Sequence, residues 1–160
     1  MNVLKYFVGA SFSYARRCNI YFKNKYYKKK YRKIDPSVRI GYETILESNK
    51  NNIEIGKKTY LQRNCQIVGN VKIGKYCSIA SNTNIWANTH SEKRGSKQSV
   101  TKEGEISIGD FCWIGSNVFI RENVKIGNKC IIGANSVVTK NFPDNSMIAG
   151  VPAKKIGEAK

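Results

Sequence analysis

Histidine is almost absent from this sequence of 160 residues, in which His90 is the only one. A metal centre built on several histidines, such as the zinc site of a hydratase, is therefore excluded, and no C-x-x-C pair offers a cysteine alternative. No apolar run approaches the ~20 residues that a membrane-spanning helix needs. We expect neither a metal site nor a membrane span.

Acidic residues are also scarce, with 11 Asp and Glu against 28 Lys and Arg. The first 33 residues contain ten Lys or Arg and no acid. Residues 21–33 (YFKNKYYKKKYRK) interleave aromatic and basic side chains, which suits an anionic lipid, a nucleic acid or an acidic glycan. A solvated basic tail is the alternative. Nothing downstream has the features of a nucleic-acid-binding module, so we expect no nucleic-acid partner.

A repeat of six residues organises the rest of the chain. Counting in sixes from Ile55 to Ile85, and from Ile108 to Val138, meets Ile, Leu or Val at every step, although only 33 of the 160 residues are of those types. A helix would need a period of 3.6 and an ordinary strand a period of 2. Three hexads make one triangular coil, and stacked coils bury a continuous aliphatic column. We predict an all-β fold, a parallel β-helix.

Two other positions of the repeat are restricted in size. Gly follows the aliphatic residue at positions 56, 74, 109, 115, 127 and 133. It is expected to supply backbone freedom, or clearance, near the corner. Four residues after the aliphatic position every side chain is small or β-branched, and four such positions are Cys65, Cys77, Cys112 and Cys130. We interpret these cysteines as buried apolar fillers, whose free thiols favour a reducing cytoplasm. Cys18 lies outside the repeat.

The repeat is interrupted in the middle of the chain. It starts weakly at residues 38–41 and slips near residues 48–51. Between Ile85 and Ile108 its phase breaks, because 23 is not a multiple of six. We therefore expect a protruding polar loop at residues 88–105. Long loops on a regular scaffold are commonly functional.

Residues 1–36 have a different pattern, which predicts a basic amphipathic helix lying either on the β-helix or on a membrane surface. Asp35 and Pro36 end this segment, and residues 37–160 form the β-helix domain. Apolar or small side chains recur at helical spacing at Leu4, Phe7, Val8, Ser11, Tyr14, Ala15, Cys18, Tyr21 and Phe22.

The C-terminal half resembles the hexapeptide-repeat acetyltransferases. Residues 108–156 contain the patterns WIGSxVxI, IGAxSVVTK and GVPAK. They are typical of the galactoside, maltose, nodulation-factor and xenobiotic group, which includes capsule and exopolysaccharide O-acetyltransferases. The resemblance covers about residues 53–157. It implies a left-handed β-helix, a homotrimer with sites in the grooves between subunits, and acetyl-CoA as co-substrate.

The same resemblance makes His90 the general base. The family's catalytic histidine follows the Ile-Gly that opens its coil by 17 residues, and Ile73 here leads to His90. A sugar hydroxyl loses its proton as it attacks a thioester carbonyl, and a neutral imidazole, with an ordinary pKa of about 6.5, can accept that proton. The candidates for orienting the ring are Glu92, Glu103 and Glu105.

The acetyl-CoA contacts are also implied by the resemblance. Ser116 matches a position near the thioester that can stabilise an oxyanion. Ala134 matches a position where a small side chain lets the pantetheine arm pass. Thr139 and Lys140 match the pair near the nucleotide end, where Lys140 suits a phosphate. Lys154 stands where members often have Arg, so the bidentate geometry is lost.

Three further positions bear on specificity. Trp113 is a candidate for the wall of the acyl pocket, although it can equally be a packing residue. Gln62 stands at the acceptor position, where galactoside-type members have Asn, so we expect a different acceptor. Gly157 replaces a second family Arg.

Taken together, the residues and the resemblance predict acetyl transfer from acetyl-CoA to a sugar hydroxyl in capsule, lipopolysaccharide or exopolysaccharide biosynthesis. The expected location is the cytoplasm, with peripheral attachment to the inner membrane face as an option. The enzymatic alternative is N-acetylation of an amino-sugar nucleotide. The alternative outside enzymes is a catalytically silent β-helix scaffold.

Overall fold

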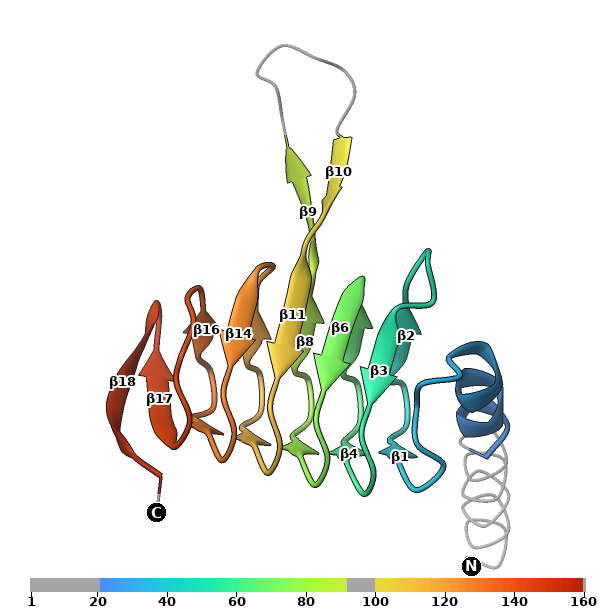
Figure 1. Cartoon of the computed structure of the whole chain (residues 1–160), viewed down its shortest axis with the longest axis horizontal. Coiled ribbons are helices and arrows are strands. Elements are labelled where there is room, and N and C mark those ends of the chain that lie inside the picture. The colour runs from blue at the N-terminus through green and yellow to red at the C-terminus, as the bar shows by residue number, and fades with distance from the viewer. Residues whose placement is uncertain (1–20, 92–99, 160) are drawn as a thin grey trace, which may run out of the picture.

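Short parallel strands build a row of stacked coils, which Figure 1 shows from the side. The structure is a computed structural model that describes residues 21–91 and 100–159. Three sheets run along the stack, and within each sheet the strands of successive coils pair in parallel register. The predicted all-β fold of stacked parallel coils is confirmed.

The three sheets are named here by their strands. Sheet A contains β3 (Ile53–Ile55), β6 (Asn70–Ile73), β11 (Glu105–Ile108) and β14 (Val124–Ile126). Sheet B contains β1 (Arg39–Ile40), β4 (Tyr60–Leu61), β7 (Ser78–Ile79), β12 (Trp113–Ile114), β15 (Ile131–Ile132), β17 (Ser146–Gly150) and β18 (Ala153–Glu158). Sheet C contains β2 (Ile45–Glu47), β5 (Gln66–Val68), β8 (Asn84–Trp86), β13 (Phe119–Ile120) and β16 (Val137–Val138).

The aliphatic positions of the repeat form the core. All twelve positions, from Ile55 to Ile85 and from Ile108 to Val138, are at most 3% exposed. Full burial of each such side chain contributes about 1.5–3 kcal/mol to folding. The repeat also extends to the N-terminal side as predicted, since Ile40 is buried in β1.

Glycine at the corners provides clearance rather than backbone freedom. A Cβ added to Gly74 would lie 2.6 Å from the carbonyl carbon of Gly109 in the next coil. The residues with a positive φ are at other positions of the coil than these glycines. Many of them are Asn, such as Asn64 (55°) and Asn82 (62°). Asn tolerates this conformation better than most residues. Of the two expected roles for these glycines, clearance is therefore the one the corners use.

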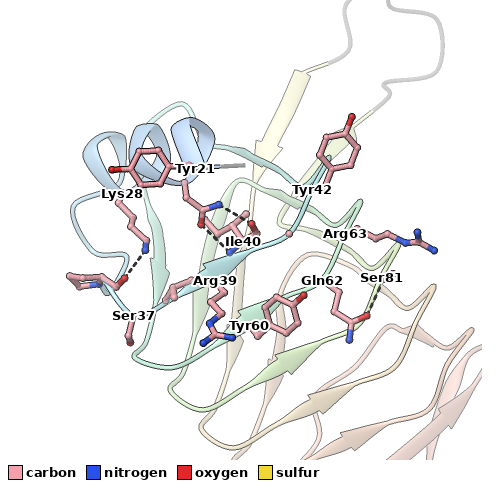
Figure 2. Close-up of a pocket in the computed structure, with 14 residues that line it drawn as sticks. Tyr21, Lys28, Ser37, Arg39, Ile40, Tyr42, Tyr60, Gln62, Arg63 and Ser81 are labelled. Carbon is pink, nitrogen blue, oxygen red and sulfur yellow. Dashed lines mark hydrogen bonds between the residues drawn. The ribbon is translucent and has the colours of Figure 1, made fainter. Parts of the chain in front are cut away.

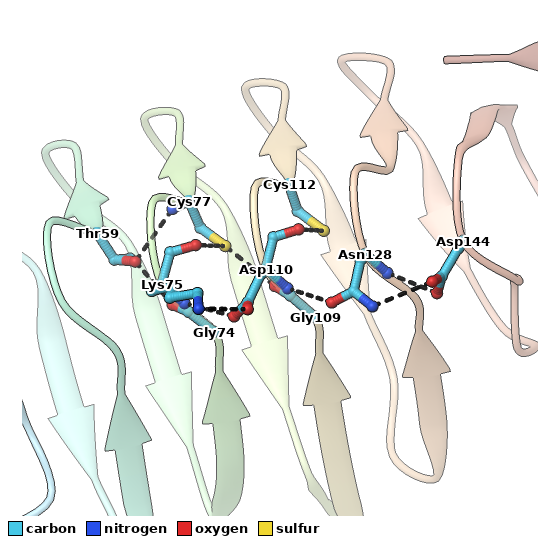
Figure 3. Close-up of polar contacts among 9 residues, drawn as sticks. All are labelled: Thr59, Gly74, Lys75, Cys77, Gly109, Asp110, Cys112, Asn128 and Asp144. Atoms are coloured by element: carbon cyan, nitrogen blue, oxygen red, sulfur yellow. Dashed lines mark hydrogen bonds and ion pairs between the residues drawn. The ribbon is translucent and has the colours of Figure 1, made fainter. Parts of the chain in front are cut away.

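The corner cysteines are buried, as their interpretation as fillers predicts, and their thiols also lie within weak hydrogen-bonding distance of backbone carbonyl oxygens. The Cys77 thiol donates to the Gly109 carbonyl oxygen (Sγ to O, 3.1 Å), and the Cys112 thiol donates to that of Gly127 (3.1 Å). Figure 3 shows Thr59, Cys77 and Cys112 at the same corner of successive coils. Each thiol takes the position that the Thr59 hydroxyl has one coil earlier, and contacts a backbone carbonyl of the next coil.

The described helix covers residues 21–30 and packs on the first coils. Tyr27 and Tyr31, four residues apart on one face, are buried, and the Tyr31 hydroxyl donates to the Leu46 carbonyl (3.1 Å). Tyr21 and Phe22, the two described members of the expected apolar face, are 65% and 66% exposed, so this part of the face does not pack on the β-helix. The other members of the face lie outside the described residues. The alternative, that the face lies on a membrane surface, stays a prediction. Among the described residues, no helix is both long and apolar enough to cross a membrane.

The chain leaves the coil where the phase of the repeat breaks, as predicted. The segment that leaves is not only a loop, because both of its ends are strands that pair as a β-ribbon. Strand β9 (Asn88–Ser91) pairs antiparallel with β10 (Val100–Glu103), and Figure 1 shows both rising from the stack. Glu105, the last residue of the predicted loop, already belongs to β11 and pairs with Asn70.

Replacing Cys77 tests the thiol bonds. Cys77→Ala should lower the free energy of unfolding by about 1–2 kcal/mol, because it removes a hydrogen bond and leaves a small void. Cys77→Thr should cost less, since Thr59 fills the same corner one coil earlier and donates to Gly74 O at 2.7 Å. Equal denaturant midpoints for the two variants would show that the thiol bond contributes nothing.

Candidate functional site

The ribbon places His90 beside the main stack. Strand β9 begins two residues after β8 ends, at the edge where sheet C turns toward sheet A. His90 is in register with Thr101 on β10. The sixfold pattern predicted that the chain leaves the coil here, and the structure places the sole histidine on the outgoing strand.

Asn88 is the polar residue that sequence reasoning missed. Its Oδ1 is buried and has no hydrogen-bond partner among the described residues. Gly69, with φ of +89°, makes room for it, since a Cβ at that position would lie 2.4 Å from Asn88 Oδ1. Asn88 is the first residue of β9, two residues before His90 in the sequence. The sixfold pattern gave no signal for its burial, because the contact with Gly69 joins two separate coils.

Two of the three acids proposed to orient His90 have other partners. Glu103 pairs with Lys50 (Oε2 to Nζ, 2.6 Å) and Glu105 with Lys72 (2.9 Å). The hydrogen bond that the Lys72 ammonium donates to Glu105 raises the pKa of Lys72 above its ordinary value. Glu92 lies outside the described residues.

Ser116 and Ala134 lie one coil apart at the corner between sheets B and C, in a series called here the corner ladder. Backbone hydrogen bonds link its levels: Asn135 N–H donates to Ser116 O (2.9 Å), and Asn117 N–H donates to Ser81 O (3.1 Å). The series continues toward the N-terminus in the same way. The corner ladder consists of Tyr42, Arg63, Ser81, Ser116 and Ala134.

Trp113 and Gln62 lie close to this ladder. Trp113 is 54% exposed on sheet B, in register with Ser78 on one side and Ile131 on the other. Gln62 is half-buried at the corner, and its Oε1 accepts a hydrogen bond from Ser81 Oγ (3.0 Å). Both lie on the sheet B side of the corner.

A groove with a volume of about 1010 Å³ runs from the corner ladder to the helix over residues 21–30. Gln62, Arg63 and Ser81 line it at the ladder, and Tyr60 and Arg39 line it on sheet B. Figure 2 shows Gln62 between Tyr60 and Ser81. The groove therefore contains one of the predicted site residues, the proposed acceptor contact.

The remaining predicted contacts lie at the C-terminal end of the stack. Thr139 and Lys140 follow β16 at the edge between sheets C and A, and both are exposed. The Lys140 ammonium lies 5.7 Å from the centre of the Phe142 ring. Lys154, also exposed, is in register with Ala149 across β17 and β18.

One chain does not bring all these residues together. His90 leaves sheet C at one edge, whereas Ser116 and Ala134 stand at its opposite edge. The described residues hold no group of three or more His, Cys, Asp or Glu that could bind a metal ion. Burial raises the pKa of the Cys65 and Cys130 thiols, which keeps them protonated.

Known proteins share both the repeat and the fold. A family model described as bacterial transferase hexapeptide (six repeats) matches residues 52–85 and 105–140. Galactoside O-acetyltransferase of Escherichia coli (strain K12) is 36% identical over 132 residues, which cover 78% of this chain. The chain spans only 60% of the length of that relative.

Two solved structures with a similar fold contain acetyl-CoA or coenzyme A. A hexapeptide-repeat acetyltransferase from Vibrio cholerae O1 biovar eltor, complexed with acetyl-CoA, matches with a TM-score of 0.70 and 25% identity over 86% of this chain and 78% of that one. A galactoside acetyltransferase in complex with coenzyme A matches with a TM-score of 0.68 and 28% identity over 87% and 80% of the two chains.

Gly69 provides a test of how the ribbon is seated. Gly69→Ala should lower the free energy of unfolding by about 1–3 kcal/mol, because the position combines a positive φ with the contact to Asn88. In an Asn88→Ala background the same change should cost less, since the clash is gone. Gly157→Ala is the control, because its Cβ would meet Met147 Sδ at an ordinary 3.7 Å. Equal costs in the two backgrounds, measured by denaturant unfolding, would exclude the Asn88 contact.

Proposed function

From its membership of the hexapeptide-repeat transferase family, we propose that this chain transfers the acetyl group of acetyl-CoA to a hydroxyl of a sugar acceptor. The observation that carries the proposal is the placement of His90 at one edge of sheet C and of Ser116 and Ala134 at the other. Two relatives support it, one named as a galactoside O-acetyltransferase and one solved with acetyl-CoA bound. We assign the reaction to capsule, lipopolysaccharide or exopolysaccharide biosynthesis.

The site is completed between subunits of a homotrimer. Sheet C exposes apolar side chains on its outer face, where Trp86 contacts Phe119 edge-on (ring centres 6.1 Å apart) and Ile45 is 43% exposed, among polar residues such as Gln66. Sheet A instead presents charged residues such as Lys72 and Lys125. Packing sheet C around a threefold axis would bring the His90 edge of one copy to the Ser116 edge of the next.

His90 acts in this site as the general base. Its neutral imidazole takes the proton of the acceptor hydroxyl while the hydroxyl oxygen attacks the thioester carbonyl carbon. The Ser116 hydroxyl, or a backbone N–H beside it, stabilises the negative charge that develops on the carbonyl oxygen. As the carbon–sulfur bond breaks, the imidazolium returns the proton to the sulfur. The base is thereby regenerated, and no acyl-enzyme is required.

The acetyl-CoA contacts follow the outside of the stack. Ala134, exposed and without a long side chain, lets the pantetheine arm pass the corner. Trp113 walls the acetyl group, and the exposed ammonium groups of Lys140 and Lys154 are available for phosphates. We place the reaction in the cytoplasm, which suits the free thiols of the corner cysteines.

Replacing the base gives the first test of this function. His90→Ala should lower the rate of acetyl transfer by about 10²-fold or more, because only the general-base contribution is lost. Acetyl-CoA affinity should change by less than about 2-fold, since its assigned contacts lie on other elements. The measurement is release of CoA thiol with a screen of oligosaccharides and one amino-sugar nucleotide. Near-normal turnover would remove His90 from the chemistry, and transfer to the amino-sugar nucleotide alone would favour N-acetylation.

Subunit mixing tests where the site is assembled. Ala134→Trp should block cofactor passage and be inactive alone, as should His90→Ala. When the two variants are refolded together, about a quarter of the intersubunit sites would combine an intact base with an intact corner. Activity should therefore return to about that fraction. No recovery from trimers shown to be mixed by mass spectrometry would contradict a shared site.

A further inference from the structure

The groove beside the corner ladder is positively charged at both ends. Lys28 comes from the helix, Arg39 from β1 and Arg63 from the corner ladder, and all three line the groove. The lining contains no acidic residue. Among residues 21–91 and 100–159, none of the three cations forms an ion pair with a carboxylate. Elsewhere on the surface, several lysines do have such partners, as Lys50 and Lys72 show.

Asp35 is an acidic residue outside the groove lining, and Lys57 and Lys28 interact with it electrostatically. Its Oδ1 accepts hydrogen bonds from the Ser37 backbone N–H (2.8 Å) and from Ser37 Oγ (2.6 Å). Those bonds lower the pKa of Asp35 below its ordinary value. The Lys28 ammonium donates to the neutral carbonyl of Pro36 (2.6 Å), which holds it at the edge of the groove.

The walls of the groove are held rigidly. Asn24 on the helix bonds both backbone groups of Ile40 in β1, donating to its oxygen (2.9 Å) and accepting from its N–H (3.1 Å). Gln62 is oriented by Ser81. Tyr60, 41% exposed, stands in register with Arg39 and offers a flat surface between the two arginines.

The groove reaches Ser81, one level of the corner ladder before Ser116 of the proposed acetyl-transfer site. Arg63 and Ser116 are two levels apart on the corner ladder, with Ser81 between them. Adjacent parallel strands are about 4.8 Å apart, so Arg63 lies about 10 Å along the stack from Ser116. A sugar whose hydroxyl reaches the thioester near Ser116 would have its neighbouring groups at the level of Gln62 and Arg63.

We infer that the groove selects an acidic saccharide as the acceptor, with Arg63 and Arg39 binding its carboxylate or phosphate groups and Tyr60 contacting a sugar face. The inference rests on the function proposed above and specifies its substrate class. Guanidinium groups bind both anions in a bidentate manner. A neutral sugar would leave the cations unmatched, and a basic acceptor would be repelled.

Direct binding tests the groove without relying on catalysis. Trigalacturonate, its neutral methyl ester and galactose 1-phosphate would be titrated calorimetrically into the full-length protein. We expect trigalacturonate or galactose 1-phosphate to bind at least about 10-fold more tightly than the ester, with the advantage shrinking as salt is added. Whichever of the two binds more tightly identifies carboxylate or phosphate as the source of the negative charge.

Matched variants assign the effect to the two arginines. Arg39→Gln and Arg63→Gln should each reduce the preference for the acid several-fold, and the double variant should abolish it. Lys125→Gln removes the same charge from sheet A, away from the groove, and should change nothing. Equal affinity of the wild type for all three compounds, or an unchanged preference for the anion in the double variant with a normal thermal melt, overturns the inference.

Acetyl-transfer assays with the same compounds separate the two proposals. Transfer that ignores acceptor charge and tolerates the double variant leaves the proposed function intact and removes the inference. Charge-selective binding without transfer to any hydroxyl acceptor keeps the anion groove and removes the proposed function.

Discussion

Backbone hydrogen bonds between successive coils hold neighbouring strands about 4.8 Å apart, and the whole structure depends on this spacing. It leaves no room for a Cβ at corner glycines such as Gly74. It also places a buried hydroxyl or thiol within reach of the next coil's carbonyl, as at Thr59 and Cys77. The restricted residue types of the repeat are therefore consequences of one distance.

The same spacing converts distant sequence positions into ordered surface rows. Arg63, Ser81, Ser116 and Ala134 become consecutive levels of the corner ladder. Residues at different levels of such a row contact different parts of a bound molecule, because successive levels are about 4.8 Å apart. Cofactor and acceptor contacts can then be set independently, by substitutions at different levels that leave the core unchanged.

The fold was predictable because its core repeats at a fixed interval, and every aliphatic position from Ile55 to Val138 is buried as expected. The corner ladder was harder to predict from the sequence, because its residues are not evenly spaced along the chain. Arg63 and Ser81 are 18 residues apart, but Ser81 and Ser116 are 35 apart, because the ribbon is inserted between them. Contacts between separate coils, such as Asn88 against Gly69, leave no periodic signal. The face of the helix that packs on the coils was not predicted, because it depends on where Tyr27 meets β2 and Asn24 meets β1, which helical spacing alone does not determine. The role of His90 and the trimer stay predictions.

The interaction of Asn24 with β1 has a consequence for the size of the molecule. A parallel stack has two unfinished ends, each a row of backbone groups ready to accept another strand. At one end the Asn24 amide pairs with the Ile40 backbone as a neighbouring strand would. At the other, β18 turns back antiparallel across a register shift in β17 and carries the exposed Lys154 and Lys155. Both edges of sheet B are thus protected against pairing with the sheet of another copy, which opposes end-to-end growth into a fibre.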